Sequence, residues 1–418
     1  MERICVEGIN HRTSELILRE KLYVPANMLA ETLSGLLKTR GIDECMILST
    51  CNRTDIYYVY SGKDMGTAAM EALCGMKNID FKKHAAAFYL FRGSRAVEHV
   101  FKVASSLDSM VIGENEVTGQ FKDAFVAALE NKSAGRVLYA LFNAAMAAEK
   151  RVRNSTDISK GAVSVSHIAV ELAAGIFGTL KGKRVLLIGA GRMAQMAAEH
   201  FRKKGAGSID VLNKTYEKAV DMSKEFKGAA YGFGSLKQAM ENTDIVLAST
   251  GSVKPVIKTK LIRGIAAKRN TPLHIIDIAV PRDTEAGIKN IKGVFVHDMD
   301  DLNKHVEKNM AARKSGYKAA EAVIKHATGK FEKMLIMKDL APVMQGIKEK
   351  IYGIVVEESL KTARENKLPL SAARLVEKNA VAVVDRIIST HMNELKKRID
   401  AGGDYESFIK LIKEEFKI

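Results

Sequence analysis

One cysteine in the sequence has neighbours that could make its thiol a nucleophile. Cys51 lies in Ser49-Thr50-Cys51-Asn52-Arg53, between two runs of β-branched, aromatic and apolar residues at 44–48 and 55–60. This pattern predicts two strands joined by a tight turn, which would hold the thiol rigidly beside a cleft. A nearby cation and oriented dipoles favour the thiolate, which is the reactive form. The pentapeptide alone leaves open that Cys51 is a small buried hydrophobic residue, like Cys45.

A second stretch predicts the binding of a dinucleotide. Lys183–Ile188 has the composition of a buried parallel strand, and an amphipathic helix reaching about Lys203 follows a glycine-rich turn. The turn has the pattern G-x-G-x-x-A and consists of Gly189, Ala190, Gly191, Arg192, Met193 and Ala194. Its glycines let the backbone approach a pyrophosphate at the helix N-terminus. A further strand at 209–212 completes the context that makes the motif specific.

The end of that further strand predicts which dinucleotide binds. An NAD-preferring site usually places Asp or Glu there to hold the ribose 2′-hydroxyl. This chain has Asn213, Lys214 and Thr215 instead, an amide, a cation and a hydroxyl that suit a 2′-phosphate. The sequence therefore favours NADPH over NADH. Loops after the later strands, at Ala248 and Ala279, are where the nicotinamide would lie.

The segments before the nucleotide motif supply weaker candidates. Residues 3–9 and 87–91 read as strands, 25–37 as a helix, and Ser94 as the N-cap of a helix that carries His99. A lone helical histidine is usually structural, so the pattern alone does not single out His99.

Residues 105–120 form an unusually polar stretch before helices predicted from about Phe121 to Arg153. Ser109, Glu114 and Gln120 could supply hydrogen bonds to a small polar substrate. Without further information, a solvated loop is the simpler interpretation of this stretch.

The order of these elements predicts an α/β protein with four parts. Residues 1–157 should form a catalytic α/β sandwich and 158–297 a Rossmann domain. Residues 298–337 predict a long linking helix, capped by Asp298 or Asp300. Residues 338–418, with interruptions at Pro369 and Gly402-Gly403, predict an all-helical dimerisation domain. A regulatory or RNA-contacting role for this last part stays open.

Composition bears on the cellular compartment of the protein and on the chemical class of its partner. The four cysteines show no Cys-x-x-Cys spacing and no nearby histidine pairs, which predicts neither a metal site nor disulfides and suits a reducing cytoplasm. Apolar runs fall short of the roughly 18 residues of a membrane span, and the start reads as a strand rather than a signal peptide, so we expect no membrane segment. The net charge of +16 divides into +2 for residues 1–160, +8 for 161–300 and +6 for 301–418. A polyanionic partner and a lysine-rich soluble surface explain that excess equally well.

Taken together, these motifs resemble the glutamyl-tRNA reductase family over nearly the whole chain. The matching stretches are Gly8-Ile9-Asn10-His11-Arg12-Thr13, Ser49 to Arg53, Ala104 to Gln120, Gly189 to Ala194, and Asp277-Ile278-Ala279-Val280-Pro281-Arg282-Asp283. The Ser-Thr-Cys-Asn-Arg block is highly specific to that family.

The resemblance implies NADPH-dependent reduction of glutamyl-tRNA to glutamate-1-semialdehyde, the first step of the five-carbon route to tetrapyrroles. It implies that Cys51 attacks the aminoacyl ester and keeps the glutamyl group as a thioester, and that Arg53 holds the side-chain carboxylate of the glutamate. Thr50, Ser109, Glu114 and Gln120 would lie at or near the substrate, and His99, near the nucleophile, would be a second catalytic residue. The family also implies a homodimer through the C-terminal helices and allows a complex with glutamate-1-semialdehyde aminomutase.

The chain departs from the family pattern in two places. It has Glu114-Asn115-Glu116-Val117-Thr118 where we expect Glu-Pro-Gln-Ile-Leu, which leaves the details of that loop open. It also ends its second Rossmann strand with Asn-Lys-Thr rather than Asn-Arg-Thr, which keeps the charge but loses bidentate phosphate geometry.

Two other classes of function remain compatible with parts of the sequence. A thioester-forming NADP-dependent semialdehyde dehydrogenase explains Cys51 and the glycine-rich turn but not the helical tail. A non-enzymatic RNA-binding or regulatory protein explains the charge but gives Cys51-Asn52-Arg53 no role. Incubation with glutamyl-tRNA, free glutamyl phosphate and NADPH separates the three.

Overall fold

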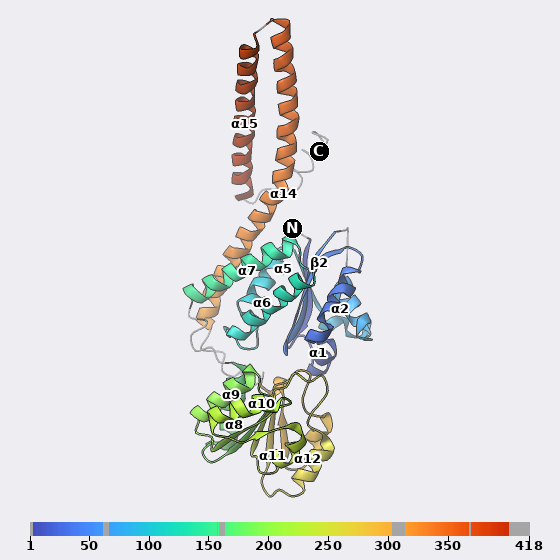
Figure 1. Ribbon diagram of the computed structural model, residues 1–418, viewed down its shortest axis with the longest axis vertical. Coiled ribbons are helices and arrows are strands. Elements are labelled where there is room, and N and C mark those ends of the chain that lie inside the picture. The colour runs from blue at the N-terminus through green and yellow to red at the C-terminus, as the bar shows by residue number, and fades with distance from the viewer. Residues whose placement is uncertain are drawn as a thin grey trace. The chain divides into compact units, whose positions relative to one another are not determined.

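The N-terminal part of the chain is a four-stranded antiparallel sheet covered on both faces by helices (Figure 1). The computed structural model describes residues 3–61, 67–156, 158, 164–302, 314–367 and 369–400. The sheet has the order β2-β3-β1-β4, and its strands are β1 Ile4–Asn10, β2 Ile42–Ser49, β3 Arg53–Tyr60 and β4 Tyr89–Arg92. Strands β1 and β3 are buried along their whole length, because both faces of the sheet are covered.

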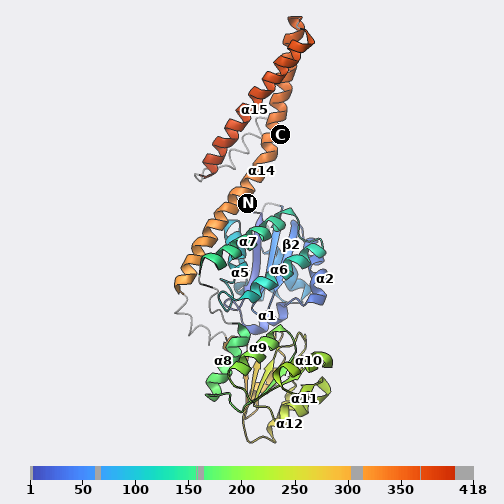
Figure 2. The ribbon, with the colours of Figure 1, turned by 60° about the vertical axis from the view of Figure 1, so that its left-hand side comes forward.

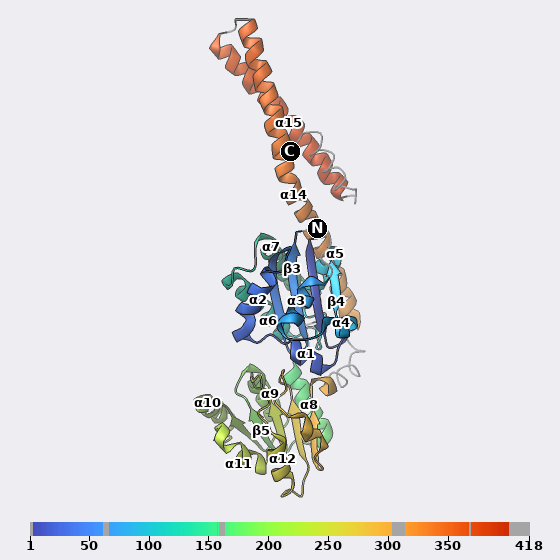
Figure 3. The same cartoon turned by 90° about the vertical axis from the view of Figure 1, so that its right-hand side faces the viewer.

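The helices of this part divide between the two faces of the sheet (Figures 1 and 3). They are α1 Leu16–Leu22, α2 Ala26–Leu37, α3 Ala68–Met76, α4 Phe81–His84, the 3₁₀ turn η1 Ala85–Ala87, α5 Ser94–Ala104, α6 Asn115–Glu130 and α7 Arg136–Ser155. Helices α1, α2 and α3 share one hydrophobic core with the sheet, and α5, α6 and α7 contact the sheet strands elsewhere. The predicted α/β sandwich is confirmed.

Three local predictions for this part are wrong. Gly93, with a positive φ of 56°, is the N-cap of α5 in place of Ser94. The predicted strand at 87–91 begins at Tyr89, because η1 takes up Ala87. Helix α6 begins at Asn115 rather than near Phe121, since Val117, Phe121 and Phe125 present one apolar face at helical spacing.

The second part is a parallel sheet with the Rossmann strand order. Its strands are β5 Arg184–Ile188, β6 Ser208–Leu212, β7 Ala230–Tyr231, β8 Ile245–Ala248, β9 Leu273–Asp277 and β10 Val294–His297. They are ordered β7-β6-β5-β8-β9-β10, and every neighbouring pair is parallel. The direction of strand order reverses between β5 and β8, which is where such sheets bind dinucleotides.

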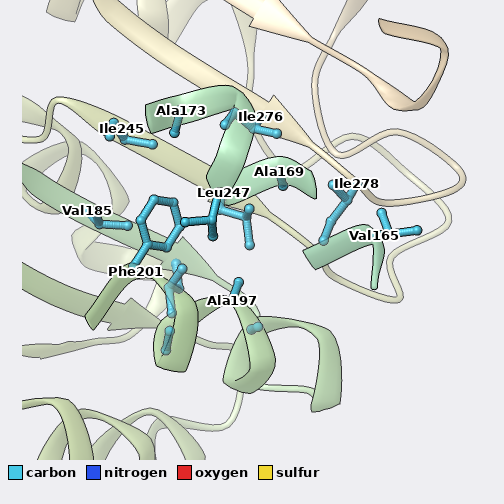
Figure 4. Close-up of a cluster of buried hydrophobic side chains, with 14 of the residues drawn as sticks. Val165, Ala169, Ala173, Val185, Ala197, Phe201, Ile245, Leu247, Ile276 and Ile278 are labelled. Atoms are coloured by element: carbon cyan, nitrogen blue, oxygen red, sulfur yellow. The ribbon is translucent and has the colours of Figure 1, made fainter. Parts of the chain in front are cut away.

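Alternate residues of these strands enter two cores, one on each face of the sheet. Figure 4 shows one of them, in which side chains of β5, β8 and β9 meet those of α8 Val165–Phe177 and α9 Arg192–Lys203. The other core joins the opposite strand faces to α11 Leu236–Glu241 and α12 Thr259–Ala266. Helix α10 Tyr216–Phe226 and the 3₁₀ turns η3 Phe233–Ser235 and η4 Ala286–Asn290 complete this part.

The C-terminal helices are long and antiparallel (Figure 2). Helix α14 runs over 52 residues, Lys314–Glu365, and α15 over 31 residues, Leu370–Asp400. Val343, Met344 and Ile347 of α14 pack with Ile388 and Met392 of α15.

The long helix differs from its prediction in one respect. It does not end at residue 337 but continues through Pro342, whose missing N–H removes one backbone hydrogen bond without ending the helix. The predicted course of the linking helix over residues 303–313 and the break at Gly402-Gly403 lie outside the described residues. Among the helices that the structure describes, none combines the length and apolar character needed to cross a membrane.

Candidate active site

The predicted turn is present, and Cys51 lies at its tip between β2 and β3. Ser49 pairs with Thr54, and Thr50 closes the turn, since its hydroxyl oxygen accepts from the backbone N–H groups of Asn52 at 3.2 Å and Arg53 at 3.3 Å. Cys51 is partly buried and packs against the hydrophobic cluster that includes Met110 and Ile278. The turn is therefore rigid, and its thiol faces residues from both the sandwich and the Rossmann part.

The charges around Cys51 do not favour the thiolate in the free protein. Burial, followed by the nearby carboxylates of Glu114 and Glu116, raises the pKa of the Cys51 thiol to about 12. The cation that acts in the other direction is Arg19, whose Nη1 donates to the Cys51 carbonyl oxygen at 2.9 Å. The expectation that the following guanidinium, that of Arg53, activates the thiol is not supported, because its charge is engaged elsewhere.

Arg53 is buried at the centre of what we call the Arg53 cluster, which consists of Arg12, Arg53, Asp55, His99 and Asp108. Arg53 Nη1 donates to Asp55 Oδ2 at 3.1 Å, and its Nη2 donates to Asp108 Oδ2 at 2.8 Å and also to the Asp108 carbonyl. Arg12, which is half exposed, donates from Nη1 to the other Asp108 oxygen at 2.9 Å. Asp108 therefore occupies the part of Arg53 that a substrate carboxylate would need.

Asp55 is fully buried, and its two oxygens are fully paired. Besides Arg53 it accepts from the Tyr57 hydroxyl at 2.8 Å and from the Tyr89 hydroxyl, and His99 Nε2 lies 3.4 Å from Oδ2. Burial acts to raise the pKa of Asp55, but the Arg53 charge and the hydrogen bonds hold it well below its usual range. Gly8 is required beside this group, because a Cβ there would lie 2.4 Å from Asp55 Oδ1.

The polar stretch before α6 is tightly folded rather than solvated. Ser109 is buried, and its hydroxyl lies 3.0 Å from the Ser106 carbonyl and 2.7 Å from the Val111 carbonyl. Glu114 is also buried, and its Oε2 has no hydrogen-bond partner. Burial, with a smaller effect from Glu116, raises the pKa of Glu114 to about 8, so this carboxyl is mostly protonated at neutral pH.

The other predicted substrate residue, Gln120, lies on α6 and is partly exposed. Glu116 belongs to the stretch that departs from the family pattern. Its charge interacts with both the Cys51 turn and the glycine-rich turn. Burial raises its pKa, and the charge of Arg192 in the glycine-rich turn opposes that rise. The Glu116 carboxylate therefore lies within electrostatic range of both Cys51 and the nucleotide site.

The predicted dinucleotide turn, residues 189–194, which we call the nucleotide turn, has the required geometry. Gly189 has a φ of 108°, and a Cβ on it would lie 2.8 Å from the Ser249 carbonyl oxygen at the end of β8. Gly191 is the N-cap of α9, and a Cβ on it would meet open space. Ala194 is buried in the core, whereas Ala190, Arg192 and Met193 remain at least partly exposed. The backbone N–H groups at the start of α9 are therefore open to a pyrophosphate, as the motif predicts.

The residues predicted to select the nucleotide lie beside this turn, after β6. Asn213 is held in place, because its N–H donates to the Tyr231 carbonyl at 3.1 Å and its Nδ2 donates to the Thr215 carbonyl at 2.9 Å. Lys214 and Thr215 are exposed. Their surroundings suit a 2′-phosphate on the ribose. For a metal, the described residues bring no three His, Cys, Asp or Glu side chains together.

Family models match three consecutive parts of the chain. The glutamyl-tRNAGlu reductase N-terminal domain matches residues 8–156, shikimate / quinate 5-dehydrogenase matches 171–305, and the glutamyl-tRNAGlu reductase dimerisation domain matches 319–418. The glutamyl-tRNA reductase of Syntrophobacter fumaroxidans is 38% identical over 407 residues, which cover 96% of this chain and 88% of that protein. The chain belongs to the glutamyl-tRNA reductase family.

Other members of the glutamyl-tRNA reductase family also match the chain over nearly its full length. The Bacillus subtilis protein of that name is 34% identical over 420 residues, 99% of this chain and 92% of its own. The solved structure of glutamyl-tRNA reductase from Methanopyrus kandleri covers 100% of both chains with a TM-score of 0.51 and 28% identity. Membership confirms the predicted fold class, the oxidoreductase class and the place in tetrapyrrole synthesis, and it makes the non-enzymatic alternative wrong. A semialdehyde dehydrogenase does not account for the matches to the first and last domains.

Several residues of the site were not singled out from the sequence. Asp55 and Asp108 hold Arg53, yet Asp108 is one polar residue among many in its stretch. Asp55 had a signal, since it is a lone carboxylate at the start of an apolar and aromatic run. Arg19 had none, because a buried arginine on a short helix looks like any surface cation.

The Asp277 to Asp283 stretch, which matches the family pattern, acts as a connector. Arg282 donates from Nε and Nη2 to the two carboxylate oxygens of Glu20 at 2.8 and 2.9 Å. Asp283 accepts from the Thr250 N–H at 2.8 Å at the end of β8. This stretch therefore links the carboxyl edge of the Rossmann sheet to helix α1 of the sandwich.

Proposed function

We propose that the chain reduces glutamyl-tRNA to glutamate-1-semialdehyde with NADPH, through a thioester on Cys51. The observation that carries this proposal is the surroundings of the thiol. Cys51 packs against the same hydrophobic cluster as Met193 of the nucleotide turn and Val280 of the connector. A nucleophile and a nicotinamide site that share one cluster can act on one carbonyl carbon in turn.

In the first step, Cys51 Sγ attacks the ester carbonyl carbon. The bond between that carbon and the ribose oxygen breaks, the thiol proton ends on the ribose hydroxyl, and the tRNA leaves. The glutamyl group stays on Cys51 as a thioester, which accepts hydride more readily than the ester does. When bound, NADPH supplies that hydride. The carbon–sulfur bond then breaks, which releases the aldehyde and returns the Cys51 thiolate.

The raised pKa of the Cys51 thiol means that substrate must help to form the thiolate. The α-ammonium of the aminoacyl ester brings a positive charge close to Sγ, and an opposite charge lowers a thiol pKa. Glu114, mostly protonated at neutral pH, offers a proton beside the reacting oxygen. Burial and the nearby carboxylates would therefore keep the thiol mostly protonated until an aminoacyl ester arrives.

Arg53 is our candidate for binding the side-chain carboxylate of the glutamate. Asp108 also has a role in this binding, which the sequence did not suggest. A substrate carboxylate can take the place of Asp108 on Arg53 Nη2, while Arg12 retains the displaced Asp108. His99 would then act on the cluster through Asp55, as a positioning residue, rather than on Cys51 directly. Thr50 and Ser109 would shape the pocket through their backbone hydrogen bonds.

NADPH is our proposed cofactor, with Gly189 to Ala194 at its pyrophosphate and Asn213, Lys214 and Thr215 at its ribose. The lack of a carboxylate at the strand end supports this choice. Arg192, exposed at the start of α9, can share the 2′-phosphate.

The C-terminal helices are our proposed dimer interface, and the four-part division given above stays our proposal for the domains. Among the described residues of these helices, the exposed large apolar side chains are Met334, Tyr352, Ile354, Leu360, Leu375, Val376, Val383 and Ile387. A second copy would cover such a surface. We place the protein in the cytoplasm, since its four cysteines are free. Direct transfer of the aldehyde to an aminomutase is a further part of the proposal.

Trapping the acyl group tests the function directly. Wild-type protein incubated with glutamyl-tRNA but no NADPH should accumulate a glutamyl adduct that hydroxylamine removes, and mass spectrometry should place it on Cys51. Cys51→Ser should form no aldehyde, because an oxygen nucleophile gives only an unreactive ester, and should still bind NADPH. Cys74→Ala is the control, with full adduct formation. An adduct on Cys5, Cys45 or Cys74 would contradict the proposal.

A further inference from the structure

The connector, Asp277 to Asp283, is fixed to the Rossmann sheet at both of its ends. Asp277 is fully buried at the end of β9, and its Oδ2 accepts from the N–H of Thr284 at 2.9 Å and from the Thr284 hydroxyl at 2.6 Å. Asp283 is also fully buried, and it accepts from the N–H of Thr250, which follows β8, at 2.8 Å. The residues between these two carboxylates are therefore held in one position relative to β8 and β9.

Those residues contact the sandwich in two ways. Ile278 belongs to the hydrophobic cluster against which Val280 and Cys51 also pack. Arg282 instead binds the carboxylate of Glu20 on α1. Its backbone N–H and its Nε donate to Oε1 at 2.7 and 2.8 Å, and its Nη2 donates to Oε2 at 2.9 Å. Three donors from one residue fix this carboxylate in a single orientation, and two of them form the bidentate pair that arginine makes best.

The neighbouring residue of α1 makes a second bridge. Arg19 is buried, its Nη1 donates to the Cys51 carbonyl at 2.9 Å, and its Nη2 pairs with Asp300, which follows β10. Two consecutive residues of α1 therefore join the backbone of the Cys51 turn to residues that follow β9 and β10. The side chains of Glu20 and Arg282 are only 15% and 19% exposed, so water competes weakly for their pairing.

The two chemical steps of the proposed function depend on this bridge to different degrees. Thioester formation uses the Cys51 turn and the sandwich. In the hydride step the thioester carbonyl carbon gains a hydride with its two electrons, the electron pair of the carbon–sulfur bond returns to sulfur, and NADPH becomes NADP⁺. This carbon is held by the sandwich, whereas its hydride donor is held by the Rossmann part. Reacting atoms must approach to about 3–3.5 Å, and a misplacement of about 1 Å can slow a reaction a hundredfold.

We propose that the ion pair of Glu20 and Arg282 positions the Rossmann part against the Cys51 turn for the hydride step. The inference rests on the proposed function. Glu20 is a positioning residue in this scheme, because it acts through Arg282 and the connector. Its loss should therefore slow hydride transfer while thioester formation continues.

Measuring the two steps separately tests this assignment. Glu20→Ala should form the glutamyl adduct on Cys51 at the wild-type rate without NADPH, and fluorescence titration should give an unchanged Kd for NADPH. Hydride transfer from the preformed thioester in a single turnover should be about ten- to a hundredfold slower. Arg282→Lys, which keeps the charge but loses the bidentate geometry, should show a smaller loss. Glu31→Ala removes an exposed carboxylate of α2 and is the matched control, with both steps unchanged.

An isotope effect distinguishes positioning from a general loss of structure. With NADPH deuterated at the transferred position, the kinetic isotope effect on steady-state turnover should be larger in Glu20→Ala than in wild type, because the hydride step then limits the rate. A variant that is merely less folded would contain fewer active molecules and would keep the wild-type isotope effect.

Spin-label distances give a readout that does not depend on turnover. Labels on Lys38→Cys of the sandwich and Lys268→Cys of the Rossmann part occupy exposed positions, and a Cys51→Ser background leaves only buried cysteines otherwise. The distribution of distances between the labels should broaden when Glu20→Ala is added and should stay unchanged when Glu31→Ala is added.

Three results would overturn the positioning role while the proposed function stands. They are equal slowing of adduct formation and hydride transfer in Glu20→Ala, a loss confined to NADPH affinity, and an unchanged distance distribution. Wild-type protein that forms no adduct on Cys51 would instead overturn the proposed function and, with it, this inference.

Discussion

In the function proposed above, the Arg53 cluster and the nucleotide turn each hold an anion, and they do so in opposite ways. The cluster uses buried side-chain charges that are already paired, with Arg53 between Asp55 and Asp108. The nucleotide turn uses backbone N–H groups and open space at Gly191, with its nearby cations exposed. A buried cluster is selective, but removing any one of its charges is strongly destabilising. A backbone site tolerates side-chain changes around it.

The largest expected effect is on the buried charges. Arg53→Ala should lower the free energy of unfolding by about 3–5 kcal/mol, because it leaves Asp55 buried without its cation. Asp55 has a depressed pKa in the folded state, so its pairing stabilises the fold above the unfolded pKa of about 3.9 and is lost on acidification. The deficit of the variant should therefore shrink as the pH falls below about 4, toward the depressed pKa of Asp55 in the folded protein.

Urea unfolding at pH 7 and pH 3.5 measures both effects. Arg53→Lys is the matched control, since it keeps the charge, and it should lose less stability than Arg53→Ala. It should still relax discrimination against glutaminyl-tRNA, because bidentate pairing with a carboxylate is lost. A loss below 1 kcal/mol for Arg53→Ala would remove the contrast with the nucleotide turn.

The next effect tests the backbone site. Gly189→Ala combines a positive φ with a Cβ placed 2.8 Å from the Ser249 carbonyl, so it should abolish measurable NADPH binding and cost at least about 1–2 kcal/mol of stability. Gly205→Ala has a φ of 82° but open space around its Cβ. It should show the backbone cost alone and bind NADPH normally, as fluorescence titration can check. Equal binding losses in both variants would mean that conformation, not close approach, matters at Gly189.

A smaller effect is expected where the two regions meet. Glu116→Gln removes one of the carboxylates that raise the pKa of the Cys51 thiol, so the pKa should fall and the thiolate fraction at a given pH should rise. Alkylation of Cys51 by iodoacetamide at pH 8 should then be faster by up to about tenfold, since one pKa unit is a tenfold change in that fraction. Glu130→Gln, at the other end of α6, should leave the rate unchanged. A slower reaction in Glu116→Gln would show that Glu116 lowers the pKa of the Cys51 thiol rather than raising it.

The smallest effect concerns an exposed cation. Lys214→Asp should reduce the preference for NADPH over NADH by less than about tenfold, since one exposed ion pair contributes roughly 1 kcal/mol. Lys268→Asp is the control, because the loop before β9 lies at the opposite edge of the sheet. Steady-state kinetics with both cofactors give the ratio. A wild type that uses NADH equally well would contradict the interpretation of this strand end, and a larger change would assign Lys214 a buried phosphate contact.

The same contrast explains what could be predicted from the sequence. The hairpin around Cys51 and the strand–turn–helix at Gly189 follow from local patterns, because each is built from consecutive residues with fixed conformational requirements. The partners of Arg53 do not, since Asp108 lies 55 residues away and its pairing depends on how a compact loop folds. The start of α6 was missed because polar residues at 114–116 masked the apolar spacing of Val117 and Phe121. The thiol pKa was misjudged because burial, which no short motif reveals, outweighs the neighbouring cation.

If Arg53 binds the glutamate side chain as proposed above, Asp108 is an internal competitor for the substrate. It holds Arg53 through a carboxylate, the same group that the glutamate side chain carries, so a ligand engages Arg53 only in the fraction of molecules from which Asp108 has moved away. Apparent affinity falls in proportion to that fraction, about tenfold for each 1.4 kcal/mol of pairing. Free glutamate and other small anions can make few further contacts to offset this loss. Under that proposal, glutamate attached to tRNA brings the contacts of a large molecule to offset the loss, so we expect free glutamate to bind much more weakly.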